Sequence, residues 1–240
     1  MIPYVVVIII QRIKMLKKAY IIAVFIVCGV LLHAGPAPAS NVGGLSYNIG
    51  PSFSVGAGVG FSMHDIHVIE NDDISDQMST SRFLVKADIA PIRYVDIYGL
   101  IGVGDLQLDD GDYSGSLGTT YGGGLRPQLF PLTWKSPLNV TLDAQYLETQ
   151  TRDSTMAARL MEFQASLIAS YVMRSLAPYG GIKYDRMAVQ FDGSTNDIEG
   201  DMDWGAFIGC DYFVTQNVFF NLELSIFTET AVFLATGFKY

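Results

Sequence analysis

The chain contains few cysteines and few histidines. There are 2 cysteines among 240 residues, and Cys28 lies in an apolar stretch near the amino end, apart from Cys210. Cys210 therefore has no partner for an internal disulfide once that stretch is removed, and the fold must be held by backbone pairing and packing. The 3 histidines leave few positions for histidine-dependent catalysis or metal binding.

Long apolar runs are also absent after residue 39. Half of the residues are hydrophobic, yet no later segment reaches the 18 consecutive apolar residues of a transmembrane helix. Apolar residues instead recur at every second position, a period that is typical of β-strands with two chemically different faces.

The amino end has the order of a signal peptide. Residues 1–39 contain four cations and no acid, and the segment from Ala19 to Leu32 is apolar. Ala37 and Ala39 supply the small residues before an expected cleavage after Ala39. Met15 begins such a peptide more regularly than Met1 does. A membrane anchor over 19–32 is the alternative, although fourteen residues are short against the roughly 20 that cross a bilayer.

Removal of residues 1–39 leaves an acidic protein of one domain. It retains 11 of the 15 Lys and Arg residues and all 24 acids, which gives a net charge of −13. Such a balance excludes nucleic acid as a partner, because phosphate binding needs a basic face. We assign residues 40–52 to a short amino-terminal segment and 53–240 to the folded domain.

The alternation predicts ten strands. In one of them, Met161, Phe163 and Ala165 oppose Glu162 and Gln164. Eight or twelve strands are alternatives, and the predicted strands are 53–69, 81–90, 94–108, 119–130, 139–149, 159–173, 179–191, 203–214, 218–227 and 230–240.

The last strand carries the most informative pattern. Val232, Leu234, Phe238 and the terminal Tyr240 share one face, as in the final strand of a bacterial outer-membrane barrel. With this strand, the alternation over residues 53 to 240 resembles the small outer-membrane β-barrel family, the OmpA-type membrane domains. The resemblance implies an all-β, antiparallel up-and-down transmembrane barrel in the outer membrane of a Gram-negative cell. It further implies a monomer in contact with lipid and lipopolysaccharide, inserted by the barrel-assembly machinery through Val232, Leu234, Phe238 and Tyr240.

The connections agree with that architecture. Short or proline-bearing links follow the second, fourth, sixth and eighth strands, as periplasmic turns would. Longer links rich in Asp, Ser and Gly follow the first, third, fifth and seventh strands, including 109–118 and 150–158. The apolar face changes phase near Gly104 and near Asp185, which predicts a β-bulge at each.

A barrel of this kind encloses its charges. If the apolar faces meet lipid, four cations and seven acids point inward, and we expect ion pairs across the interior because an unpaired buried charge is costly. The structural interpretation is a polar plug, and a narrow cation-leaning pore is the alternative. The residues are Lys86, Asp88, Asp96, Arg126, Asp143, Glu162, Lys183, Asp185, Asp211, Glu223 and Lys239.

Catalytic and metal sites are weakly indicated. His64, Asp65 and His67, with Asp109 and Asp110 opposite, could serve an outer-membrane hydrolase, although polar residues at a strand end are the simpler interpretation. An acidic loop offers oxygen atoms to calcium without the full EF-hand pattern, through Asp192, Asp197, Glu199 and Asp201. We expect no cofactor, no metal and no enzymatic activity.

The expected role is therefore structural or one of surface interaction through acidic outer loops. Aromatic residues near strand ends suit interfacial girdles. Toward the periplasm these are Tyr94, Tyr98, Trp134, Tyr171, Tyr179 and Tyr212, and toward the outside they are Tyr121, Tyr146, Phe191 and Trp204.

Overall fold

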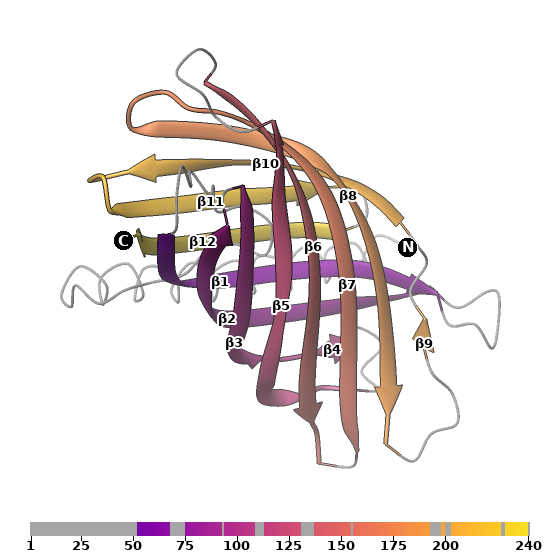
Figure 1. Cartoon of the computed structure of the whole chain (residues 1–240). Helices are drawn as coiled ribbons and strands as arrows, with labels where there is room; N and C mark the ends of the chain where they lie inside the picture. The colour runs from indigo at the N-terminus through magenta and orange to yellow at the C-terminus, as the bar shows by residue number, and fades with distance from the viewer. Residues whose placement is uncertain are drawn as a thin grey trace, which may run out of the picture. The chain divides into compact units, whose positions relative to one another are not determined.

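Every long element of the described chain is a β-strand (Figure 1). The computed structural model describes residues 52–67, 75–92, 94–108, 113–130, 137–154, 156–192, 198–199, 203–226 and 229–239. Its long strands are β1 (Ser52–His67), β2 (Ser75–Ile92), β3 (Val95–Gly104), β5 (Ser116–Phe130), β6 (Leu138–Arg152), β7 (Ala157–Tyr171), β8 (Leu176–Phe191), β10 (Asp203–Phe213), β11 (Val218–Ile226) and β12 (Glu229–Lys239). Two two-residue strands, β4 (Gln107–Leu108) and β9 (Ile198–Glu199), pair with β2 and β8.

The ten long strands form a closed antiparallel barrel. Around the barrel the strands follow the order β1-β12-β11-β10-β8-β7-β6-β5-β3-β2. The barrel closes because β1 pairs with both β2 and β12. Closure leaves no open sheet edge, so the backbone donors and acceptors of the wall are satisfied by neighbouring strands. The ten-strand antiparallel barrel that the alternation predicted is confirmed. No helix among the described residues has the length and hydropathy of a membrane span.

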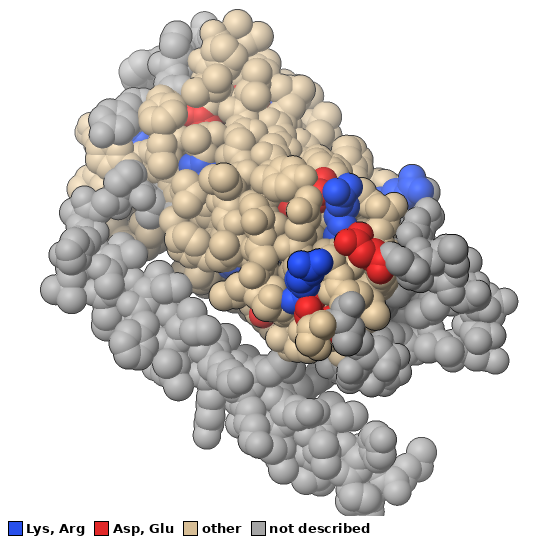
Figure 2. Space-filling model, turned by 90° about the horizontal axis from the view of Figure 1, so that it is seen from below, with Lys and Arg blue, Asp and Glu red and all other residues tan. Residues whose placement is uncertain are grey.

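The two faces of the wall differ in chemistry. Large apolar side chains lie exposed on the outside, among them Ile101 at 61%, Leu167 at 42% and Ile208 at 65%. Charged side chains on the alternate positions are buried inside. In Figure 2, charged side chains gather in one region of the visible surface, and much of the remaining described surface carries few. The polarity of a water-soluble barrel is thus inverted over most of the wall.

Glycines on β1 make room for a ring on β12. Gly58 and Gly60 are inward positions, and a Cβ placed on Gly60 would lie 2.5 Å from Phe233 Cδ2. Phe233 is buried there with Leu84, Leu100 and other apolar side chains. The glycine-rich sequence of the first strand therefore serves close packing inside the barrel.

Gly60→Val is expected to lower the free energy of unfolding by about 1–3 kcal/mol, because the added side chain overpacks Phe233. The measurement is a urea titration of the barrel in phospholipid vesicles. Gly99→Val is the matched control, since a Cβ at Gly99 meets nothing within 4 Å. Equal stability of the two variants would contradict the packing argument.

The two predicted bulges are wrong. Arg82 pairs with Gly104 and Ser79 with Gln107, so both strands advance by the same number of residues past Gly104. The β7–β8 register is likewise continuous from Lys183 to Met187. The change of apolar face has another cause: at this end of the barrel the apolar side chains point inward.

An apolar cluster fills the interior at this end. Leu106 and Leu160 are fully buried, and Tyr113 stacks edge-on against Phe191 with ring centroids 5.3 Å apart. The cluster contains Met78, Leu106, Tyr113, Ala158, Leu160, Met187 and Val189, with Leu108 and Phe191 packed against it. Over these residues the barrel has an apolar core, as a soluble barrel does.

The same end extends further than predicted. The link expected over residues 150–158 is only 153–156, because β6 continues to Arg152 and β7 begins at Ala157. Asp153 closes this hairpin, its carboxylate accepting from the amide of Met156 at 2.7 Å. The reversed polarity removed the outward apolar signal, so the ends of these strands resembled loops in the sequence.

Several predictions lie outside the described residues. These are the signal peptide 1–39 with its start, the segment from 40 to 51, and Trp134, Asp109, Asp110, Asp197, Asp201 and Tyr240. Of the remaining residues of the last strand, Val232 is exposed on the outward face of β12, with Leu234 and Phe238 at alternate positions from it.

Candidate functional site

All eleven charged residues assigned to the interior lie at inward positions of the described strands. They divide by burial into two sets. Lys86, Asp96, Arg126, Asp143, Lys183, Asp211 and Glu223 are buried, and Asp88, Glu162, Asp185 and Lys239 are half-buried. The site they form is the polar interior of the barrel.

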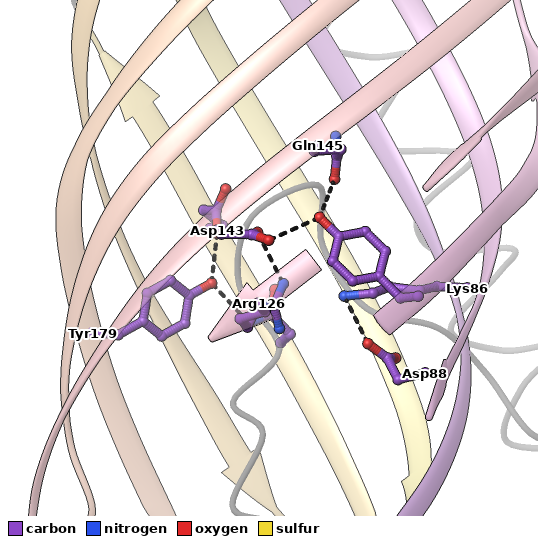
Figure 3. Close-up of polar contacts among 9 residues, drawn as sticks. Lys86, Asp88, Arg126, Asp143, Gln145 and Tyr179 are labelled. Carbon is purple, nitrogen blue, oxygen red and sulfur yellow. Dashed lines mark hydrogen bonds and ion pairs between the residues drawn. The ribbon is translucent and has the colours of Figure 1, made fainter. Parts of the chain in front are cut away.

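Arg126 and Asp143 form its central ion pair. Arg126 Nη2 on β5 donates to Asp143 Oδ2 on β6 at 3.1 Å, and both side chains are about 3% exposed. The Tyr98 hydroxyl on β3 lies 2.9 Å from Asp143 Oδ1 and 3.2 Å from Gln145 Oε1. In Figure 3, Arg126 and Asp143 turn toward each other from the neighbouring strands β5 and β6. The Asp143 charge is thus stabilised by two donors.

Lysines pair with acids two residues away on the same strand. Lys86 Nζ lies 3.2 Å from Asp88 Oδ1 and 3.9 Å from the centroid of the Tyr98 ring (Figure 3). Lys183 Nζ lies 3.1 Å from Asp185 Oδ2. Because side chains two apart share one face of a strand, these pairs form within the interior without crossing it.

A second polar group joins β8, β10 and β11. Tyr179 donates its hydroxyl to Glu223 Oε2 at 2.8 Å, and Asn221 Nδ2 lies 2.9 Å from the same hydroxyl. Asn221 Nδ2 also lies 2.5 Å from Asp211 Oδ1. Asp211 and Glu223 are therefore linked through neutral donors rather than by direct contact between acids.

One ion pair reaches across the interior. Arg82 on β2 pairs with Glu162 on β7, four strands away around the barrel. Arg82 was missing from the predicted set because it lay at the start of its predicted strand. The sequence does indicate that Arg82 points inward, because it is next to the outward Phe83 and shares a face with Leu84 and Lys86.

Three aromatic residues are not girdle residues. Tyr98 and Tyr179 are buried inside, and Phe191 packs against the apolar cluster. The two tyrosines fit because they face glycines: a Cβ on Gly124 would collide with Tyr98, and one on Gly209 would collide with Tyr179. These correspondences between strands are not visible in a single strand's pattern.

The arrangement pairs four interior cations with carboxylates. Arg82, Lys86, Arg126 and Lys183 each have a carboxylate within 4 Å. Lys86, Asp96 and Asp211 have no exposed surface at all. Charges held this way stabilise one another only while both partners remain, so the network is suited to filling and fixing the barrel.

The residues proposed for hydrolysis fall only partly within the described chain. His64 is buried at an inward position and borders a cavity of about 30 Å³ with Glu162 and Asp185. Asp65 and His67 belong to β1, but the opposing Asp109 and Asp110 lie outside the described residues. Among described residues, no group of three or more His, Cys, Asp or Glu side chains could hold a metal ion. Of the calcium candidates, only Asp192 and Glu199 fall within the described chain.

Comparison with known proteins gives remote likenesses. No family model matches the chain, and no curated protein matches its sequence. The translocator domain of the autotransporter NalP from Neisseria meningitidis is 11% identical, with a TM-score of 0.42 over 80% of this chain and 90% of that one. An outer membrane channel from Pseudomonas putida F1 is 11% identical, with a TM-score of 0.42 over 85% and 100%.

The outer membrane protease OmpT from Escherichia coli is 12% identical, with a TM-score of 0.38 over 79% of this chain and 95% of that one. Similarity at this level assigns neither a family nor an activity. The resemblance to OmpA-type domains therefore stays a prediction from the strand pattern.

Proposed function

We propose that this chain is a monomeric outer-membrane β-barrel with a structural or surface-interaction role, closed inside by its polar network. One observation carries the proposal: large apolar side chains are exposed on the outward face, while Lys, Arg, Asp and Glu side chains are buried on the inward face. The first strand then begins and the last strand ends on the periplasmic side, together with the connections that follow β2, β5, β7 and β10.

The energetics favour lipid as the solvent of the outward face. Leaving a Leu or Ile side chain in water forgoes roughly 1.5–3 kcal/mol of transfer free energy. Outward apolar residues recur around the wall, for example Ile89, Leu142, Ile182 and Leu222. Exposed apolar areas beyond about 300–600 Å² are unusual for soluble monomers, whereas a membrane barrel needs such a band.

The burial of the interior supports a closed barrel. A water-filled channel would leave some surface of its lining side chains accessible, yet Lys86, Asp96 and Asp211 have none. Small barrels are commonly filled by their own side chains. We therefore propose a plug rather than the narrow cation-leaning pore, and no enzymatic activity.

Planar-bilayer recording tests the plug. Purified barrel is expected to insert without discrete conductance steps. The triple variant Lys86→Ala, Tyr98→Ala and Arg126→Ala removes three large inward side chains and is expected to conduct, which shows that insertion and detection work. Discrete open steps from the unaltered barrel would overturn the proposed closure.

The proposed partners follow from the site of insertion. They are the surrounding lipid and lipopolysaccharide, and the barrel-assembly machinery, which would engage β12 through its outward residues Val232, Leu234 and Phe238. Acidic outer connections are the proposed contact region for other molecules.

A further inference from the structure

The interior contains a small polar cavity beside Arg82. Its volume is about 20 Å³, and the polar side chains that border it belong to Ser62, Thr80, Arg82, Glu223 and Ser225. All five residues are buried. A cavity needs roughly 10–15 Å³ to hold one water molecule, so this one has room for a single ligand of that size.

Arg82 brings an unsatisfied donor to the cavity. Its two terminal nitrogens, Nη1 and Nη2, both pair with Glu162 across the barrel. Its Nε is buried and has no hydrogen-bond acceptor within the part of the chain that the structure describes. A buried donor without an acceptor is costly, more so when it is charged, and a ligand in the cavity that Arg82 borders can accept from it.

The other polar groups around the cavity select a neutral ligand. Glu223 borders it while its Oε2 accepts the Tyr179 hydroxyl at 2.8 Å. Ser62 Oγ and Thr80 Oγ1 lie 2.8 Å apart, so one hydroxyl donates to the other and the second has a proton to donate elsewhere. Glu223 repels an anion and Arg82 repels a metal cation, whereas water both accepts and donates.

We propose that this cavity binds one water molecule, which accepts from Arg82 Nε and donates to the Glu223 carboxylate. The bridge connects the Arg82–Glu162 pair with the group that Tyr179 forms on β8, β10 and β11. Polar side chains of five strands then belong to one hydrogen-bonded network. The inference rests on the proposed closure, because in an open channel this molecule would be one of many.

A crystal structure of the detergent-solubilised barrel, at a resolution that shows ordered solvent, tests the site. One density peak is expected about 2.7–3.2 Å from both Arg82 Nε and a Glu223 oxygen. A crystal soaked in bromide is expected to show no anomalous signal in the cavity. An anomalous peak there would assign the cavity to an anion and overturn the proposal, as would the absence of ordered density.

A double-mutant cycle measures whether the water couples the two side chains. Arg82→Met combined with Glu223→Met is expected to raise the unfolding equilibrium constant by about threefold less than the product of the two single effects. The control cycle combines Arg82→Met with Asp96→Asn. Asp96 is eight residues from Gly104, the residue of β3 that pairs with Arg82, which is about 26 Å along the strand, so its coupling should stay below about twofold.

Ser225→Val distinguishes a water bridge from a direct interaction between the two charges. The larger apolar side chain is expected to fill the cavity and displace the water, so the coupling of Arg82 with Glu223 should fall below about twofold. Coupling that persists in this background would overturn the bridge. Closure fails separately: discrete conductance refutes the plug, whereas a silent barrel without this water loses only the hydration site.

Discussion

Leu167→Arg is expected to lower the free energy of unfolding in phospholipid vesicles by about 2–4 kcal/mol, the cost of a cation near the midplane of a membrane barrel. Leu167 lies on β7 between Leu142 of β6 and Ile182 of β8, in one row of the sheet. All three side chains are outward and between 41% and 50% exposed. An arginine there would have acyl chains, not water, around its charge.

Gln150→Arg is the matched control. Gln150 is exposed on β6, four residues past the outward Tyr146 and toward the loop end of the strand, where the same cation should cost about 0–1 kcal/mol. Urea titrations in vesicles of one lipid composition measure both variants. Equal losses of stability at the two positions would show that the outward face does not lie in a bilayer. Improved solubility of folded Leu167→Arg in buffer without lipid or detergent would point to a soluble barrel instead.

Arg126→Met is expected to destabilise the barrel by about 3–5 kcal/mol, because it leaves the buried Asp143 carboxylate without its cation. Both partners are almost fully enclosed, so water cannot replace the lost interaction. The Tyr98 hydroxyl would still contact Asp143 but cannot supply a charge. The free energy of unfolding in vesicles, followed by tryptophan fluorescence, measures the effect.

The double variant Arg126→Met with Asp143→Leu should recover most of that loss, since replacing both members of a buried pair with apolar groups is often nearly neutral. Arg174→Met, in an exposed turn, should stay within about 0.5 kcal/mol of wild type. A double variant no more stable than Arg126→Met alone would show that Arg126 does not act by balancing the charge of Asp143.

The reversal of polarity along the wall connects these predictions. Over most of the wall, apolar residues face out and charges face in. Past the level of the outward Tyr146 and Phe163, Leu106, Leu160 and Val189 instead turn inward. A strand that leaves a bilayer for water must exchange the chemistry of its two faces to keep its apolar side chains dry. This exchange is what resembled bulges near Gly104 and Asp185 in the sequence.

Much of the barrel could be predicted from local pattern. The number and approximate position of the strands and the inward phase of residues such as Lys86 and Asp143 follow from a two-residue period, which each strand displays by itself. The outer ends of β2, β6 and β7 could not be recognised, because their outward residues become polar and resemble loop residues.

The sequence by itself determined a chain of alternating strands with charges on one face, because side-chain alternation is a property of each extended segment. Only the tertiary structure decided which charges meet, as Arg82 and Glu162 do, and that Tyr98 and Tyr179 enter the interior. Those outcomes depend on the register and curvature that place one strand's glycine or carboxylate opposite another strand's side chain. Such correspondences arise only when the barrel closes.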